Sequence, residues 1–318
     1  MRAVELPGTK RVTTQLGFGC SYILPENTTL LDAAYDAGIR HFDVARSYGR
    51  GLSEKCVGEF LTRHKSDVTV TTKYGLYYPA AEGIYPFLRS IGRPIAKRMR
   101  GAARISGAVT AAVGAGPTKG KFTAREARLS LERSLRTLRS ESIDIFLMHE
   151  ATAEDLTDEG LLRFLENSVS AGRIGSFGVG GSNERVDLLY SQNRPYCDVL
   201  QFDWTPLEPV IMRNGVFNIV YRIFRHGRRG LAKWIDEMPE TKVRWSERIG
   251  FDIVNIDDLE KLLLKAAVEL RPTDLVLFSS ADPKHIFRNV EVVNDEALRA
   301  PALSLAKLLL TEVQPLAL

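Results

Sequence analysis

The sequence predicts an α/β fold in which eight parallel strands close into a barrel surrounded by helices, a (β/α)8 TIM barrel. Short apolar runs of strand length alternate with segments of helical period along most of the 318 residues, and such alternation favours a parallel sheet. Polar side chains also stand at or just beyond the carboxyl ends of three successive strand candidates, where barrel enzymes build their sites. Because barrels of this length fold as one unit, residues 1–318 are predicted to form a single domain.

The first third of the chain is predicted to form an N-terminal β-hairpin followed by a β-α-β-α-β run. The stretch MRAVELPGTKRVTTQ has the pattern of a hairpin that turns at residues 7–8, a Pro-Gly pair. The first helix is expected to have Asn27 or Thr28 as its N-cap and to end at Gly38, and the second to begin at Ser53. The strand candidates of this region are residues 15–20, 39–44 and 68–73.

A long insertion after the third strand, residues 76–122, interrupts the alternation. It far exceeds the usual connection of about two to six residues between a strand and a helix. It carries eight Lys and Arg residues against one acid, Glu82, so its formal charge is +7, whereas that of the whole chain is +4. We predict a basic, mobile lid of two short helices over the active site, which would attract an anionic substrate. A solvated insertion without a role and a membrane-surface helix are the alternatives.

The alternation resumes after the insertion. Thr123 and Glu126 have the spacing of a capping box at a helix start, and Asp257 with Glu260 is expected to cap a later helix. The remaining strand candidates bring the number to eight. They are residues 143–149, 174–180, 198–204, 216–221 and 274–280, with helices expected over 157–171, after 182–183 and over 303–310.

The composition bounds the class of protein. No run approaches the roughly eighteen apolar residues that cross a bilayer, and the N-terminus lacks the apolar region of a signal peptide. A cytoplasmic protein without a membrane span is therefore expected. The net positive charge comes from the insertion, and the rest of the chain has a net charge of −3, so no nucleic-acid partner is expected. Three scattered cysteines predict neither disulfides nor a zinc site; Cys20, at a strand end, is either a small core residue or part of a ligand pocket.

Four residues that can handle protons stand at the strand ends: Asp43, Tyr48, Lys73 and His149. A tyrosine with its usual pKa of about 10 is a poor acid near neutrality. A neighbouring Lys ammonium lowers that pKa and a carboxylate fixes the Lys, so Tyr48, Lys73 and Asp43 together make a proton donor for a carbonyl oxygen that His149 would orient. The alternative from spacing alone is structural: a rim ion pair, a loop tyrosine and a histidine that caps a strand.

Two other kinds of site are not indicated. The five histidines contain no H-x-H or H-E-x-x-H pairing, so no metal site is predicted, and His41 is expected to be a packed strand residue. No G-x-G-x-x-G fingerprint follows a strand, so a Rossmann dinucleotide site is not predicted either. Residues 178–183, GVGGSN, form a strand-to-helix turn whose exposed amides suit a polar ligand group.

Several of these stretches together resemble the aldo-keto reductase family. FDVARSYGRGLSEKCVGEFL is similar to the family signature, in which Asp, and Tyr five residues later, precede a Ser-Glu helix start. TTKYG and IDIFLMHE resemble the lysine and histidine stretches, and AREARLSLERSLRTL and LVLFSSADPKHIFRNVEVV extend the similarity in register. The Y-G-x-G-L-S-E pattern is most similar to the sugar-dehydrogenase-like bacterial branch. The family fold is a TIM barrel, which the alternation of elements predicts on its own.

The resemblance implies an oxidoreductase that transfers hydride between a nicotinamide cofactor and a small carbonyl or alcohol substrate: an aldehyde, a ketone or an aldose. It assigns Tyr48 as the acid-base group, with Asp43, Lys73 and His149 completing a catalytic tetrad. An alternative class is a catalytically weak, cofactor-binding regulatory protein on the same fold, because a fold does not fix a function. The complete tetrad argues against this alternative.

The resemblance also assigns residues to the cofactor. Gln201 falls where the family binds the carboxamide of the nicotinamide, and Tyr221 falls where an aromatic ring stacks on it. In many NADP-dependent relatives a Lys and an Arg near the eighth strand hold the 2′-phosphate, whereas Ser279 and His285 stand there in this chain. NADP(H) and NAD(H) therefore both remain open as the cofactor. The other residues that the resemblance implies for cofactor binding are Gly19, Ser182, Asn183, Arg222, Arg225, Ser280 and Asn289.

Overall fold

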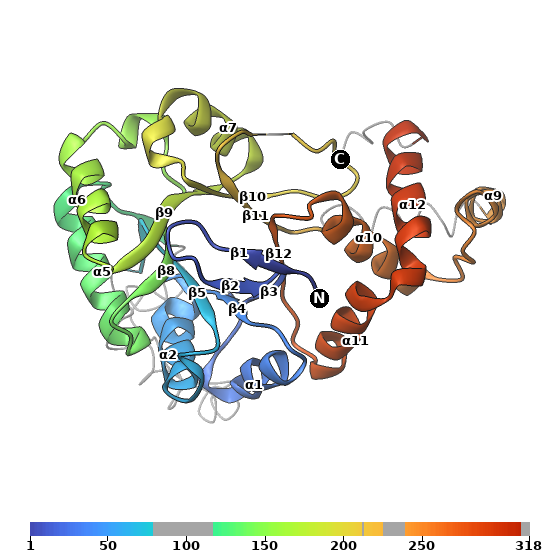
Figure 1. The fold of residues 1–318 in the computed structure, drawn as a ribbon, viewed down its shortest axis with the longest axis horizontal. Helices are drawn as coiled ribbons and strands as arrows, with labels where there is room; N and C mark the ends of the chain where they lie inside the picture. Colours follow the sequence, from blue (N-terminus) through green and yellow to red (C-terminus); the bar gives the residue numbers. More distant parts are fainter. Residues whose placement is uncertain (79–116, 212, 225–238, 313–318) are drawn as a thin grey trace, which may run out of the picture.

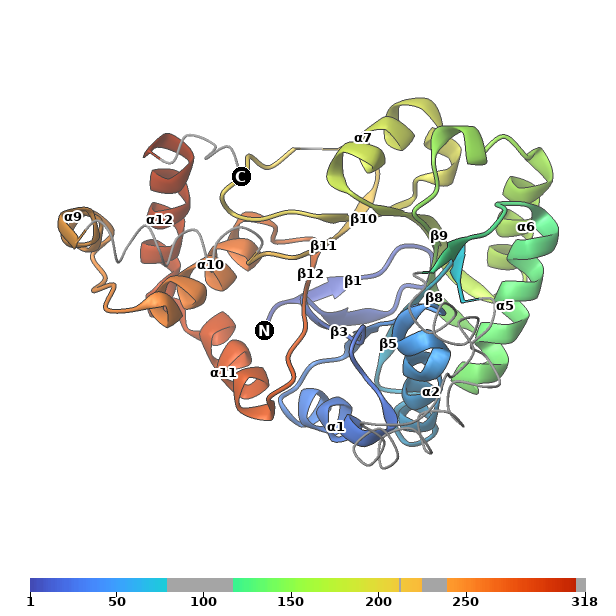
Figure 2. The same ribbon diagram turned by 180° about the vertical axis from the view of Figure 1, so that it is seen from behind.

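The computed structural model describes residues 1–78, 117–211, 213–224 and 239–312, and Figures 1 and 2 show it from opposite sides. Eight strands form a closed barrel in which all neighbouring pairs are parallel. The predicted (β/α)8 TIM barrel is therefore confirmed. In barrel order the strands are β3 (Leu16–Gly19), β4 (His41–Asp43), β5 (Thr69–Tyr74), β8 (Ile143–His149), β9 (Ile174–Gly181), β10 (Val199–Asp203), β11 (Phe217–Tyr221) and β12 (Leu275–Phe278).

The predicted strands agree with the observed ones to within one or two residues at each end. β8 coincides with the predicted residues 143–149, because strands of a parallel barrel are buried on both faces and their apolar runs are continuous. The N-terminal hairpin is also confirmed: β1 (Ala3–Glu5) pairs antiparallel with β2 (Val12–Thr14). Gly8, in the turn, has a φ of +76°, a conformation that favours glycine.

Helices surround the barrel strands (Figure 1), and no helix in the described ranges is long and apolar enough to cross a membrane. The helices α9 and α11 were not predicted. The α-helices are α1 (Thr29–Asp36), α2 (Leu52–His64), α5 (Ala124–Leu138), α6 (Glu159–Ser170), α7 (Asn183–Gln192), α9 (Pro239–Ile249), α10 (Ile256–Leu270), α11 (Pro283–Asn294) and α12 (Arg299–Glu312). Short 3-10 helices are η1 (Pro25–Asn27), η2 (Tyr48–Gly51), η3 (Ala153–Asp155), η4 (Arg194–Tyr196) and η6 (Glu296–Leu298).

The predicted helix caps are confirmed in part. Thr123 accepts a hydrogen bond from the backbone N–H of Glu126 at the start of α5. Thr28 is the N-cap of α1 but makes no side-chain bond there. The predicted Asp257 cap of α10 is wrong. Asn255, two residues earlier, accepts from the first free N–H groups, and α10 therefore begins one residue before the predicted cap.

The described residues between β10 and β11 contain no helix, so the Phe202 ring is covered in another way. Arg213 lies in this connection, and its guanidinium carbon stands 4.3 Å from the centre of that ring. Its Nε and Nη2 atoms donate to Asp187 and Asn183 of α7 at 2.8 Å and 2.6 Å. The guanidinium of Arg271 lies 5.3 Å from the same ring centre, so two arginines make cation–π contacts with Phe202.

The buried core has an inner and an outer part. Inside the barrel, Leu147, Ile219 and Leu275 form one cluster with Val4 and Leu6 of the hairpin, which therefore closes one end of the barrel. A larger cluster lies between the strands and the helices that surround them. A third one joins α9, α10 and α12 at one side of the barrel (Figure 2).

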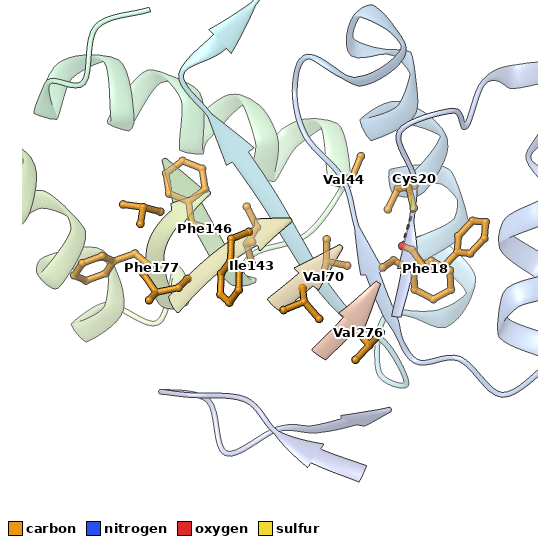
Figure 3. Close-up of a cluster of buried hydrophobic side chains, with 14 of the residues drawn as sticks. Phe18, Cys20, Val44, Val70, Ile143, Phe146, Phe177 and Val276 are labelled. Carbon is orange, nitrogen blue, oxygen red and sulfur yellow. Dashed lines mark hydrogen bonds between the residues drawn. The ribbon is translucent and has the colours of Figure 1, made fainter. Parts of the chain in front are cut away.

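Cys20 belongs to the large outer cluster, part of which Figure 3 shows. Its side chain is fully buried, and its Sγ atom donates to the carbonyl oxygen of Phe18 at 3.6 Å. It does not line the pocket at the strand ends. Of the two interpretations of Cys20, the small core residue is therefore the one that holds. All three cysteines are buried and free.

The two ends of the insertion lie side by side directly after β5. β6 (Leu76–Tyr77) pairs antiparallel with β7 (Thr118–Lys119), and the N–H of Gly120 donates to the carbonyl of Gly75 at 2.6 Å. The predicted lid and its two short helices fall on residues 79–116, which lie outside the described residues.

Replacing residues 79–116 with a short Gly-Ser turn is expected to leave the barrel folded. The β6–β7 ribbon already holds the flanking residues in register, with Tyr77 opposite Thr118, so a hairpin turn of about two to four residues joins them. We expect the Tm from circular dichroism to change by less than about 5 °C. A variant without a cooperative unfolding transition would contradict this and would mean that the segment packs as part of the core.

Candidate active site

A pocket of about 640 Å³ opens at the carboxyl ends of the barrel strands. The ends of parallel strands meet at one rim of a barrel, so side chains from distant parts of the sequence converge there. Those at or next to a strand end include Gly19, Asp43, His149, Gly181, Tyr221 and Phe278.

Asp43, Lys73 and Tyr48 form a connected group beside this pocket. The Nζ atom of Lys73 donates to Oδ1 of Asp43 at 2.6 Å, to the carbonyl oxygen of Val44 at 3.0 Å and to the hydroxyl of Tyr48 at 3.3 Å. All three N–H groups of the ammonium therefore have acceptors. Lys73 and Asp43 are only 1% and 3% exposed, so this is a buried pair and not an ion pair at a solvated rim.

Tyr48 reaches Lys73 because the chain turns sharply in η2. Gly49 and Gly51 have φ values of +54° and +88°, in the left-handed region that favours glycine. A Cβ atom on Gly49 would also lie 2.6 Å from the hydroxyl oxygen of Ser53, which is too close. The Y-G-x-G stretch of the sequence thus encodes the turn that brings the phenol to the ammonium.

Burial and charge set the protonation states of this group. Burial by itself lowers the pKa of Lys73, but Asp43 and Tyr48 outweigh it, and the net pKa is raised above its usual value. Burial raises the pKa of Tyr48, and Lys73 opposes that rise only in part. Lys73 acts in the expected direction, yet the net shift is upward, so Tyr48 is protonated near neutral pH.

His149 lies against Tyr48, with the two rings edge to face and their centres 6.0 Å apart. Burial, and then the charge of Lys73, lower the pKa of His149 to about 3. The imidazole is therefore neutral at pH 7 and has one N–H to donate.

Glu150 is a pocket residue to which the sequence analysis gave no role. It follows His149 directly, has a φ of +61° and forms an ion pair with Arg185 of α7. A Cβ atom on Gly181 would lie 3.6 Å from Oε2 of Glu150, so the ion pair stands over a glycine at the pocket edge. The sequence signal that could have identified Glu150 is its position at the end of a strand, the same criterion that selected His149.

A sequence profile of the aldo/keto reductase family matches residues 15–229, more than half of the chain. The chain belongs to the aldo/keto reductase family. The suspected family is thus confirmed, and the matched range contains Asp43, Tyr48, Lys73 and His149.

Known relatives of this aldo/keto reductase include proteins named as an oxidoreductase and as a dehydrogenase. It is 24% identical over 220 residues to the uncharacterized oxidoreductase YqkF of Bacillus subtilis, a match that covers 65% of this chain and 60% of that protein. It is also 51% identical to D-threo-aldose 1-dehydrogenase from a Pseudomonas species over a stretch of 51 residues, and this stretch covers 16% of each chain. The matched part of the chain thus spans less than two thirds of the length of either relative.

Solved structures share the fold along almost the whole chain. The aldo-keto reductase AKR11C1 from Bacillus halodurans, in its holo form, has a TM-score of 0.68 at 19% identity over 96% of each chain. The glycerol dehydrogenase AKR11B4 from Gluconobacter oxydans has a TM-score of 0.64 at 18% identity over 98% of each chain. An aldo-keto reductase from Klebsiella pneumoniae, solved with NADPH, has a TM-score of 0.58 at 18% identity over 92% of this chain and 90% of that one.

Five of the residues assigned to the cofactor line the pocket of this aldo/keto reductase: Gly19, Gln201, Tyr221, Arg222 and Ser279. The hydroxyl of Tyr221 donates to the carbonyl of Gly181 at 3.0 Å, and that of Ser279 donates to the carbonyl of Gly19 at 2.8 Å. Arg222 has a φ of +60°. This group spans the side of the pocket formed by β10, β11, β12 and β3.

The other assigned residues that the structure describes do not line the pocket. Ser182 caps α7, and the side-chain oxygen of Asn183 accepts from Arg213, so Gly180 and Gly181 form the pocket edge in their place. The Ser182 hydroxyl accepts from the N–H of Arg185 at the start of α7, and Asn183 binds Arg213 of the β10–β11 connection; the sequence pattern reveals neither contact. Ser280 donates to the carbonyl of Asp282, His285 is exposed, Asn289 is buried in α11, and Arg225 lies outside the described residues.

His41 is a packed strand residue, as predicted. It is fully buried, and its two ring nitrogens lie 2.9 Å and 3.1 Å from the hydroxyls of Thr69 and Thr71. Burial, and then Lys73, lower its pKa to about 3. In an unfolded chain the pKa is about 6.5, so unfolding releases a ring that takes up a proton at mildly acidic pH.

The free energy of unfolding is therefore expected to be highest above about pH 6.5 and to fall as the pH is lowered toward 3. His41 and His149 each contribute a slope of up to about 1.4 kcal/mol per pH unit. Urea unfolding between pH 7 and pH 4 measures the slope, and His41→Gln should reduce it. His285→Gln, at an exposed position, is the control that should leave it unchanged. Equal slopes for wild type and His41→Gln would contradict the prediction.

Proposed function

We propose that this aldo/keto reductase transfers hydride between NADP(H) or NAD(H) and a small carbonyl or alcohol substrate, with Tyr48 as the general acid and base. The observation that carries the proposal is the Tyr48 hydroxyl, 3.3 Å from a buried ammonium that is itself paired with Asp43, at the edge of the pocket. A protonated phenol beside a fixed positive charge suits the donation of a proton to a carbonyl oxygen that gains negative charge.

Each residue of the tetrad has a separate role. Lys73 has no N–H left for the substrate, so it acts through Tyr48: its charge stabilises the phenolate that remains after proton transfer. Asp43 holds the ammonium in place. The neutral His149 donates its N–H to the carbonyl oxygen and thereby aims it at the Tyr48 hydroxyl. In the oxidative direction the phenolate of Tyr48 accepts the proton of the alcohol.

The pocket fits a nicotinamide ring and its carboxamide. Gly180 and Gly181 leave its edge open, Gln201 offers an amide, and the Tyr221 ring provides an aromatic face. The cofactor, when bound, supplies or accepts the hydride. Arg222, whose side chain is 65% exposed, would meet the negative charge of the cofactor's phosphates.

The substrate class follows from the tetrad and from the relatives. The tetrad requires only a carbonyl or alcohol, and the named relatives include an aldose dehydrogenase and a glycerol dehydrogenase. We therefore propose an aldehyde, a ketone or an aldose as substrate. A negatively charged one would be favoured by the basic insertion, residues 76–122.

The proposal is tested by titration with NADPH and NADH, followed by oxidation of each cofactor in the presence of an aldehyde, ketone and aldose panel. We expect turnover of at least one carbonyl, with a preference for NADPH over NADH below about a thousandfold, or about 4 kcal/mol. The reason is that Ser279 is bonded to Gly19 and brings no charge to the 2′-phosphate. A stronger preference would contradict this expectation, and tight cofactor binding without any turnover would favour the regulatory alternative.

A further inference from the structure

Gln201 makes a contact that its assignment to the cofactor does not explain. Its Nε2 atom donates to Oδ2 of Asp43 at 2.6 Å, while Oδ1 of the same carboxylate accepts from Lys73 at 2.6 Å. Gln201 and Asp43 are each 3% exposed. The buried carboxylate thus has one close donor on each oxygen, and hydrogen bonds to an ionised group are about twice as strong as neutral ones.

The orientation of the Gln201 amide follows from this partner. A carboxylate only accepts hydrogen bonds, so the NH₂ group faces Asp43 and the carbonyl oxygen Oε1 points elsewhere. Gly180 of β9 is the strand neighbour of Gln201, and a Cβ atom there would lie 3.5 Å from Oε1. Both residues line the pocket. Oε1 is therefore able to accept from a ligand amide while Nε2 holds Asp43.

We propose that Gln201 is a positioning residue that couples cofactor binding to the proton-donating group. The inference rests on the proposed function, in which the nicotinamide carboxamide lies against Gln201. A carboxamide N–H bonded to Oε1 fixes the plane of the glutamine amide, and this fixes the hydrogen bond from Nε2 to Asp43. Asp43 in turn holds Lys73 against Tyr48. The bound cofactor thus orders the acid-base group through one side chain, without a contact to Lys73.

The pH dependence of catalysis reports on this arrangement because few nearby groups titrate near neutrality. Five titratable groups interact electrostatically with Asp43, with Lys73 or with both: Cys20, His41, Tyr48, His149 and Tyr221. The pKa values of both histidines are lowered to about 3, and those of Cys20, Tyr48 and Tyr221 are raised. A shift of either limb of the profile on substitution of Gln201 therefore reports on the connected group of Asp43, Lys73 and Tyr48, which Gln201 contacts through Asp43.

Two substitutions of Gln201 should move the pH profile in opposite directions. Gln201→Leu removes the Nε2 donor from the connected group of Asp43, Lys73 and Tyr48, so the acid limb of kcat should move to higher pH. Gln201→Glu keeps the shape of the side chain but places two carboxyl groups together, and the pair shares one proton. The pair loses this proton as the pH rises, so the alkaline limb of kcat should move to lower pH. Gln201→Leu should also lower kcat by about ten- to a hundredfold, as expected for a hydrogen bond to a charged group.

The profiles are measured with 4-nitrobenzaldehyde at saturating concentration of the preferred cofactor. Gln15→Leu is the matched control: Gln15 is also buried, and its Nε2 atom donates to the carbonyls of Val268 and Arg271 at 2.8 Å, away from the pocket. Neither limb should move in this variant. Circular dichroism establishes that each variant is folded, and the isosteric Gln201→Glu keeps the test open if Gln201→Leu does not fold.

The coupling is overturned if both Gln201 variants lose kcat without a shift of either limb, since that is the result for a residue that only packs or only binds cofactor. In that case the wild type still reduces carbonyls and Tyr48→Phe does not, so the proposed function stands. A wild type without any carbonyl turnover would refute the proposed function, and the coupling with it.

Discussion

Tyr48→Phe is expected to lower kcat for carbonyl reduction by about 10²- to 10⁴-fold, the range that general acid-base catalysis supplies. The substitution removes one hydroxyl group and nothing else. Lys73 loses its acceptor at 3.3 Å but keeps Asp43 at 2.6 Å and the carbonyl of Val44 at 3.0 Å. The fold and the affinity for the cofactor should therefore be preserved, which thermal unfolding and fluorescence titration measure separately from turnover.

Tyr74→Phe is the matched control for this experiment. Tyr74 follows Lys73 in β5, is 3% exposed, and its hydroxyl has no hydrogen-bond partner among the described residues. Removing that hydroxyl should leave kcat unchanged. Near-normal turnover of Tyr48→Phe, with a deuterium isotope effect that establishes hydride transfer as the slow step, would show that Tyr48 is not the proton donor.

Lys73→Met should lower kcat to a similar degree and, unlike Tyr48→Phe, should destabilise the fold by about 3–5 kcal/mol. The variant leaves the Asp43 carboxylate buried without its cation. It also removes the charge that opposes the rise in the pKa of Tyr48, so the phenolate becomes harder to form. Urea unfolding measures the loss of stability, and turnover is measured at a temperature where the variant is folded.

Lys265→Met separates the loss of activity from the loss of stability. Lys265 is also fully buried, donates to the carbonyl of Val293 at 2.9 Å and pairs with Glu269 at 3.1 Å, in α10. Lys265→Met should destabilise the fold somewhat less than Lys73→Met does, because Glu269 keeps its ion pairs with Arg2 and Arg299. It should leave kcat unchanged in the folded protein. Equal losses of kcat in the two lysine variants would attribute the effect of Lys73→Met to unfolding.

The sequence by itself determined the order and extent of the barrel strands, because those properties are local. A strand buried on both faces must be a continuous apolar run, and residues 143–149 are such a run. The convergence of Asp43, Lys73 and His149 was also predictable, since the carboxyl ends of parallel strands meet at one rim. In the Y-G-x-G turn that carries Tyr48, glycine occupies two of the three positions with positive φ, and Arg50 occupies the third at +57°.

Only the tertiary structure decided how those residues are charged and what else they touch. The pKa of Tyr48 rises because burial outweighs Lys73, and burial depends on side chains from many elements at once. The hydrogen bond between Gln201 and Asp43 joins residues 158 positions apart across the barrel, and no local pattern indicates it. Ser182 caps α7 and Asn183 accepts from Arg213, so neither residue lines the pocket. The distance between side chains on non-neighbouring strands depends on how the barrel closes. Barrel closure depends on all the packing contacts together, so no short stretch of sequence determines this distance.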